Sequence, residues 1–270
     1  MNQDQKARYF QSLHQEGEAF VMPNPYDRGT TRLLEGLGFK ALATTSAGYA
    51  LTRGVLDHQI SREEMLAHCA EIVLATSLPV NADLGNGFGD EPGVVAETIG
   101  LAIEVGLAGA SIEDMKPDRT LYPIDAAVRR IEAAAEAAHG KGCSFVLTAR
   151  AENYLVGDRN LGHVITRLQA YQEAGADVLY APGLGDPVEI AELVRSVDRP
   201  VNFLGGIPGH GLSVPALGKL GVKRISVGSG LAVAAFGAFL KAAREMRDEG
   251  TFVYANDVSA YGDLKEFLSS

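Results

Sequence analysis

The amino-acid sequence predicts an α/β protein of the (β/α)8 class, a TIM barrel, and three observations support that prediction. Eight short apolar runs, of the kind that form buried parallel strands, alternate with helical patterns. Four segments share one order, in which a helix ends, a glycine follows and a strand begins. The length of 270 residues suits eight such units in one domain. An open doubly wound sheet is the alternative arrangement.

The expected elements follow one another regularly from the N-terminus. Ser61 and Glu64 form a Ser-x-x-Glu capping box, which predicts that a helix begins at residue 62. The expected strands are residues 20–23, 41–46, 80–84, 110–114, 145–150, 178–182, 201–204 and 225–228. The expected helices are residues 29–37, 62–76, 93–105, 124–139, 161–174, 187–197, 214–220 and 231–247. The four repeated turns are residues 36–41, 106–110, 174–178 and 220–225.

Composition and charge argue against several classes of protein. Hydrophobic residues make up 46% of the chain, which is enough for a large core. The net charge of −10 argues against a nucleic-acid partner, because phosphate binding needs a basic surface. No apolar run reaches the length of a membrane span, and the polar N-terminus lacks the apolar core of a signal peptide. Cys69 and Cys143 are far apart, which argues against a disulfide framework. We therefore expect a cytoplasmic protein.

We expect residues 1–270 to form a single barrel domain, with residues 231–270 as a C-terminal helical segment. The stretch 231–239 is apolar almost all round, so its helix should be buried on most sides. Two arrangements would bury it: cover by the tail at residues 251–268, or packing on a neighbouring subunit.

Polar residues end three neighbouring expected strands. Asp83, the pair Glu113-Asp114, and Arg150 each follow an apolar run, and parallel strands would bring their C-terminal ends together. Carboxylates suit a hard divalent cation, and a guanidinium suits a carboxylate substrate. The structural alternatives are helix caps by Asp83 and Asp114, and ion pairs of Arg150 with Glu113 or Glu152.

Two further segments could contribute to the same site. Thr44 to Gly48 combines small hydroxyl residues with glycine, whose backbone N–H groups could bind a carboxylate; an ordinary Ser/Thr turn is the alternative. Asn202 could donate to the same ligand or make a hydrogen bond inside the barrel. The glycine-rich residues 85–90 lack a full nucleotide-binding spacing and are interpreted as backbone that approaches a ligand.

Six segments together resemble the isocitrate lyase/phosphoenolpyruvate mutase superfamily, in family order and across residues 15–245. They are Pro23-Asn24-Pro25-Tyr26-Asp27, Thr45-Ser46-Ala47-Gly48, Gly54-Val55-Leu56-Asp57, Asn81-Ala82-Asp83-Leu84-Gly85, Ser111-Ile112-Glu113-Asp114 and Thr148-Ala149-Arg150. The resemblance implies a (β/α)8 barrel whose eighth helix is exchanged between subunits of a homodimer or homotetramer. It also implies Mg²⁺, with Mn²⁺ as an alternative, and a small 2-oxo acid substrate.

Carried over by position, the resemblance places Asp57, Asp83 and Glu113 around the metal. It places the substrate carboxylate against Arg150 and the backbone of Thr45, Ser46, Ala47 and Gly48, with Asn202 as a further substrate contact.

The chain departs from the family pattern in two regions. Asn81 stands where the family usually has aspartate. Residues 115–123 contain neither the cysteine nor the histidine of the isocitrate and methylisocitrate lyases, and they are fewer than in the mutases and hydrolases. Lys116, Arg119 and Tyr122 are the candidates there for a gating or proton-handling role, and Lys116 and Tyr122 join Arg150 as expected catalytic residues.

We therefore expect a Mg-dependent lyase or decarboxylase that cleaves a C–C or P–C bond beside a 2-oxo acid through an enolate. The substrate would be a small 2-oxo dicarboxylate. A phosphonopyruvate or phosphoenolpyruvate mutase or hydrolase is one alternative. A non-catalytic protein that binds a 2-oxo acid is the other.

Overall fold

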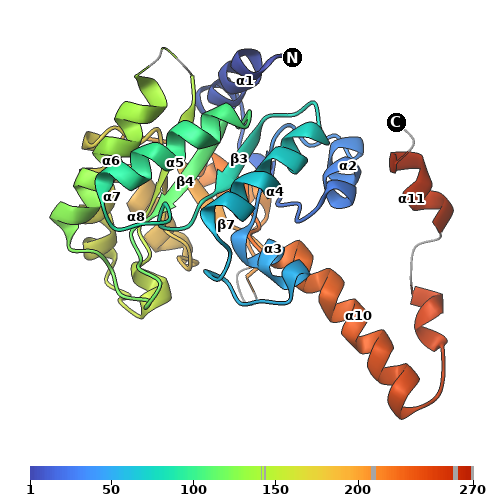
Figure 1. Cartoon of the computed structure of the whole chain (residues 1–270). Coiled ribbons are helices and arrows are strands. Elements are labelled where there is room, and N and C mark those ends of the chain that lie inside the picture. Colours follow the sequence, from blue (N-terminus) through green and yellow to red (C-terminus); the bar gives the residue numbers. More distant parts are fainter. Residues whose placement is uncertain (141, 143, 208–210, 258–260, 269–270) are drawn as a thin grey trace.

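Eight parallel strands form one sheet that curls into a nearly closed barrel (Figure 1). The computed structural model describes residues 1–140, 142, 144–207, 211–257 and 261–268. The strand order is β1-β8-β7-β6-β5-β4-β3-β2, and a hydrogen bond of 3.0 Å from the Ala43 N–H to the Pro23 carbonyl links the two ends. The strands are β1 (Phe20–Met22), β2 (Leu42–Ala43), β3 (Val80–Asp83), β4 (Gly109–Glu113), β5 (Val146–Arg150), β6 (Val178–Tyr180), β7 (Val201–Leu204) and β8 (Arg224–Ser226). This order confirms the predicted barrel over the open sheet.

Helices between the strands surround the barrel, and each of the eight expected helices is present. They are α2 (Arg28–Gly36), α4 (Arg62–Leu74), α5 (Pro92–Glu104), α6 (Ile124–His139), α7 (Leu161–Glu173), α8 (Pro187–Arg195), α9 (Val214–Lys219) and α10 (Gly230–Asp248). As predicted, Ser61 caps α4, accepting a hydrogen bond of 3.1 Å from the Glu64 N–H. The repeated turns are also confirmed, because Gly38, Gly106, Gly175 and Gly221 all have positive φ.

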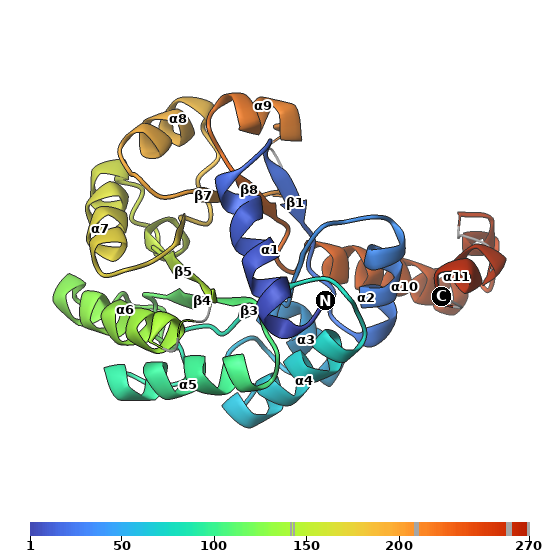
Figure 2. The same cartoon turned by 90° about the horizontal axis from the view of Figure 1, so that it is seen from above.

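Three α-helices and two 3-10 helices were not predicted. They are α1 (Gln3–Gln15), α3 (Ser46–Arg53), α11 (Tyr261–Leu268), η1 (Asn153–Val156) and η2 (Val253–Asp257). Helix α1 had a readable signal, because Asn2 and Gln5 form a capping box. Its residues Ala7 and Phe10 pack with Phe20 and Val146, so α1 closes one end of the barrel (Figure 2).

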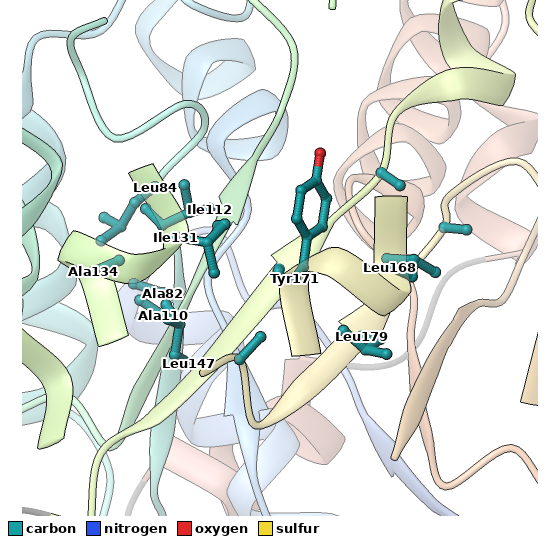
Figure 3. Packing of buried hydrophobic residues seen from close by; sticks show 14 of the residues in the cluster. Ala82, Leu84, Ala110, Ile112, Ile131, Ala134, Leu147, Leu168, Tyr171 and Leu179 are labelled. Carbon is teal, nitrogen blue, oxygen red and sulfur yellow. The ribbon is translucent and has the colours of Figure 1, made fainter. Parts of the chain in front are cut away.

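Side-chain alternation along the strands separates the core from the site. Ala82, Ala110, Leu147 and Leu179 belong to the main apolar cluster, which includes α6 and α7 residues such as Ile131 and Leu168 (Figure 3). Toward the C-terminal ends of β3, β4 and β5 the alternating positions are polar, and they include Asp83, Glu113 and Arg150. The same pleat that buries the core therefore gathers the polar groups on the other side of the strands.

Helix α10 extends away from the barrel (Figure 1), and along it Ala232 is buried. Phe239 is 72% exposed and Val233 is 56% exposed, so the expected cover by residues 251–268 is wrong for the single chain. Instead, α11 packs on α2, where the Phe267 ring lies so close to Gly36 that it leaves no room for a Cβ there. None of the described helices is both long enough and apolar enough to cross a membrane.

Candidate functional site

Arg150, at the end of β5, lies among three carboxylates. Its Nη1 is 3.0 Å from Asp83 Oδ1, its Nη2 is 3.1 Å from Glu113 Oε2, and its Nε is 2.6 Å from Glu152 Oε1. The strand register explains the contact with β4, because Glu113 pairs directly with Arg150. The structure therefore brings the three predicted strand ends together. It also shows the structural alternative, in which Arg150 pairs with both Glu113 and Glu152.

Asp83 is held from its other side by the start of α3. The backbone N–H and the hydroxyl of Ser46 each donate to Asp83 Oδ2 at 3.0 Å. The Asp83 N–H in turn donates to the Thr44 hydroxyl at 2.9 Å. Asp83 therefore contacts the first turn of α3 rather than capping the helix that follows β3.

Glu113 is 3% exposed, and its Oε1 has no hydrogen-bond donor among the described residues. Burial raises the pKa of Glu113 well above its usual range; Arg150 opposes this effect, whereas Glu152 and Asp83 add to it. His58 lies on that side of the carboxylate, with its Nδ1 4.0 Å from Glu113 Oε1. Glu113 thus has an unused acceptor inside the site.

Asp114 points to the helical layer, away from Glu113. Its Oδ1 accepts the Glu152 N–H at 2.9 Å, and its Oδ2 accepts from Tyr171 at 2.5 Å and from Arg167 at 3.0 Å. Asp114 thereby fixes the backbone of Glu152, whose side chain contacts Arg150. The alternative interpretation of Asp114 as a helix cap is wrong, because Asp114 accepts instead from the Glu152 N–H and from side chains on α7.

The predicted backbone donors lie at the N-terminus of α3. Thr45 is the N-cap, and its hydroxyl accepts the Gly48 N–H at 3.1 Å. The Ser46 N–H is bound to Asp83, so the Ala47 N–H lies between two engaged donors in the first turn. Thr45, Ser46, Ala47 and Gly48 are therefore close to the carboxylate cluster through Ser46.

Asn202 lies in a polar network inside the barrel. Its Oδ1 accepts from Arg224 Nε at 2.7 Å, and its Nδ2 donates to the Ser226 hydroxyl at 3.0 Å. A chamber of about 40 Å³ lies beside it, lined also by Asp83, Arg150 and Asn81. The structure therefore places Asn202 next to the site. It also shows the alternative, in which Asn202 makes hydrogen bonds inside the barrel.

Arg224 was missed by sequence reasoning, although a charged residue beside an apolar strand run was a usable signal. It is 1% exposed, and its guanidinium contacts the neutral side chains of Asn202, Thr148 and His14. Burial lowers the pKa of Arg224 to about 9.

A larger cavity of about 360 Å³ adjoins the carboxylate cluster. Ser46, which binds Asp83, and Gly85, whose carbonyl accepts the Glu113 N–H at 2.9 Å, both line it. Asp57 and His58 line the same cavity and are neighbours, with the His58 N–H donating to Asp57 Oδ1 at 3.1 Å. Asp57 thus faces the site region without joining the Arg150 cluster.

The loop after β4 places Lys116 and Tyr122 to one side. Tyr122 is 3% exposed; its hydroxyl donates to Asp90 Oδ1 at 2.6 Å and accepts from Asn86 Nδ2 at 2.9 Å. Burial, with the Asp90 hydrogen bond, raises the pKa of Tyr122 to about 12. Lys116 Nζ lies 5.3 Å from the Tyr122 ring centroid and lines a separate cavity. The ion pairs of Arg150 are with Asp83, Glu113 and Glu152, whereas Lys116 and Tyr122 contact each other and Tyr122 contacts Asp90.

The residues offer oxygen ligands to a metal ion but are not assembled around one. Within the described part of the chain, no three His, Cys, Asp or Glu side chains are grouped as a metal site. The buried, unpaired Oε1 of Glu113 and Oδ1 of Asn81 are hard oxygen acceptors of the kind that Mg²⁺ prefers. The donor chemistry therefore fits a hard divalent cation, with Asp83 currently engaged by Arg150 and Ser46.

This chain is similar in sequence and in structure to several known proteins. The family model described as phosphoenolpyruvate phosphomutase matches residues 10–247. A solved Burkholderia cenocepacia J2315 structure, named only as a lyase/mutase, is 52% identical, with a TM-score of 0.96 over 99% of this chain and 97% of that one. An uncharacterized Mycobacterium tuberculosis protein is 33% identical over 88% of this chain and 89% of its own length. Oxaloacetate acetylhydrolase, solved with its product oxalate, is 26% identical, with a TM-score of 0.86 over 98% and 94% of the two chains.

Proposed function

Because the chain belongs to the phosphoenolpyruvate mutase/isocitrate lyase superfamily, we propose that it cleaves a C–C bond beside the carbonyl of a small 2-oxo dicarboxylate through an enolate. The observation that carries this proposal is the placement of Arg150 between Asp83, Glu113 and Glu152 at the strand ends. The likeness to oxaloacetate acetylhydrolase, a protein named for a C–C cleavage of oxaloacetate, supports the same bond type.

The chain's own residues would bind and orient the substrate. Arg150 would bind one substrate carboxylate through its guanidinium. The Ala47 N–H, which lies between the engaged N–H groups of Ser46 and Gly48 in the first turn of α3, would bind the same carboxylate. Glu152 would keep the guanidinium in place, because its Oε1 holds Arg150 Nε. Asn202 would line the small chamber beside Arg150. Lys116 and Tyr122, in the loop after β4, are proposed to handle a proton or to gate the site.

A divalent cation, Mg²⁺ or Mn²⁺, would be held by Asp57, Asp83 and Glu113. When bound, it would supply positive charge that stabilises the enolate oxygen. The superfamily is typically Mg-dependent, which supports this assignment.

Calorimetry with oxalate, with and without Mg²⁺, tests the binding half of the proposal. We expect oxalate to bind only when Mg²⁺ is present. The activity half is tested by pyruvate release from oxaloacetate, which Asp83→Ala should abolish. Metal-independent or absent oxalate binding would rule out this function.

Binding without turnover of any 2-oxo acid would favour a non-catalytic binding protein, for which Asn81 in place of aspartate is the supporting observation.

Cleavage of a P–C bond is the second candidate, because the matching family model is itself described as a phosphomutase. A screen that includes phosphonopyruvate beside 2-oxo dicarboxylates separates the two reactions.

We also propose that the protein forms a homo-oligomer in which α10 packs on a neighbouring subunit. The exposed apolar side chains of α10, which include Val233, Phe236 and Phe239, support this assembly. A cytoplasmic location stays a prediction.

A further inference from the structure

The cavity of about 360 Å³ beside the carboxylate cluster has an apolar wall. That wall is formed by Ile60, Met65, Leu84, Phe88 and Pro117. Met65 is 1% exposed and Leu84 is fully buried, so these side chains are fixed by the core behind them. Pockets of this size are typical of small-molecule sites, and apolar walls recognise apolar parts of a ligand.

The charges around this cavity disfavour an anionic group. Asp90, which is not among the proposed metal ligands, lines it together with Asp57 and His58, and among the described residues that line it there is no lysine or arginine. A carboxylate or phosphonate placed here would lose its hydration and meet negative charge. The ligand part that occupies this cavity should therefore be uncharged.

Phe88 is held in an unfavourable backbone conformation at this wall. Its φ is 63°, which is unusual for a bulky residue, and the Asn86 side chain fixes its N–H with a hydrogen bond of 3.1 Å. Such strain persists where the surroundings over-determine it, and it is often found at functional sites. The loop thus keeps an aromatic side chain at the cavity at an energetic cost.

We propose that this cavity receives an apolar substituent larger than a methyl group, carried by the substrate on the carbon next to its 2-oxo carbon. This inference rests on the proposed function and narrows its substrate class. Ser46 and Gly85 connect the cavity to Asp83 and Glu113, so a substrate held at Arg150 could extend into it. Phe88, Met65 and Ile60 would then determine specificity for the substituent.

Calorimetry on the Mg²⁺-loaded protein with pyruvate, 2-oxobutanoate, 2-oxopentanoate and 2-oxohexanoate tests the inference without requiring turnover. We expect the affinity to rise about threefold to fourfold with each added methylene until the cavity is filled.

Phe88→Ala should reduce the gain in affinity per added methylene, whereas Phe88→Leu should retain most of that gain. Phe252→Ala, at a side chain that is 67% exposed, is the matched control. The wild-type ligand series stands as a test even where a variant fails to fold. If pyruvate binds but the affinity does not rise with chain length, this inference is overturned and the proposed function is not. Absence of binding for every 2-oxo acid would overturn both it and the proposed function.

Discussion

Arg150 Nε donates to Glu152 Oε1 at 2.6 Å, and the Glu152 side chain is fully buried. The Arg150 guanidinium is thus oriented before any ligand arrives, with its other nitrogens on Asp83 and Glu113. Pre-orientation matters because a planar guanidinium binds a carboxylate well only in a matching plane. Glu152, rather than the substrate, therefore sets the plane in which Arg150 presents its donors.

Arg150→Lys should weaken oxalate binding by about tenfold to a hundredfold, because an ammonium cannot reproduce the planar, multi-directional donors of arginine. The measurement is the dissociation constant by calorimetry in the presence of Mg²⁺. Arg195→Lys, at an exposed position on α8, serves as the control and should bind like the wild type. An Arg150→Lys protein with unchanged oxalate affinity would show that this side chain does not contact the ligand.

Tyr171→Phe should lower the free energy of unfolding by about 1 to 2 kcal/mol, because Asp114 loses a buried hydrogen-bond donor. The hydroxyl lies 2.5 Å from Asp114 Oδ2, and Asp114 Oδ1 holds the Glu152 N–H. We also expect weaker oxalate binding, because Asp114 would hold the Glu152 backbone less firmly and Glu152 orients Arg150. Denaturant unfolding and calorimetry measure the two effects, and Tyr9→Phe on α1 is the control. If Tyr171→Phe changed stability alone, Asp114 would have no influence on Arg150.

The sequence was sufficient to predict the barrel and the meeting of Asp83, Glu113 and Arg150, because the ends of buried parallel strands converge wherever the strands pair in order. It could not predict that Glu152 is buried, since a residue two positions past a strand end usually belongs to an exposed loop. Nor could periodicity find α3, whose start depends on the cap by Thr45 and on the contact of Ser46 with Asp83. These features depend on neighbouring elements rather than on local pattern.

Removal of the chain after Gly230 should leave insoluble or unfolded protein, if α10 packs on a neighbouring subunit as proposed. A finer test is Phe239→Glu, which places a charge on an apolar face that is otherwise exposed in the single chain. Light scattering should then report a smaller species than the wild type. Glu249→Ala, just beyond the helix, should leave the size unchanged. A well-behaved truncated monomer would rule the exchange out.

His14 should make the barrel sensitive to acid. Burial lowers the pKa of His14 to about 3, and the nearby Arg224 adds to this effect. The neutral ring suits its surroundings, because Nδ1 lies 2.8 Å from the Phe10 carbonyl and Nε2 lies 3.3 Å from Arg224 Nη1. In the unfolded chain the pKa returns to about 6.5, so the unfolded state binds the proton more readily. The stability contributed by His14 is therefore present above pH 6.5 and falls as the pH drops towards 3.

Between pH 7 and pH 4.5, this residue should account for a loss of about 2 to 3 kcal/mol in the free energy of unfolding. Other groups titrate in the same range, so the measurement is the difference in pH dependence between the wild type and His14→Gln. Glutamine can still accept from Arg224 but cannot be protonated, so its unfolding free energy should depend less steeply on pH. Parallel pH profiles for the wild type and His14→Gln would mean that His14 does not carry the acid sensitivity.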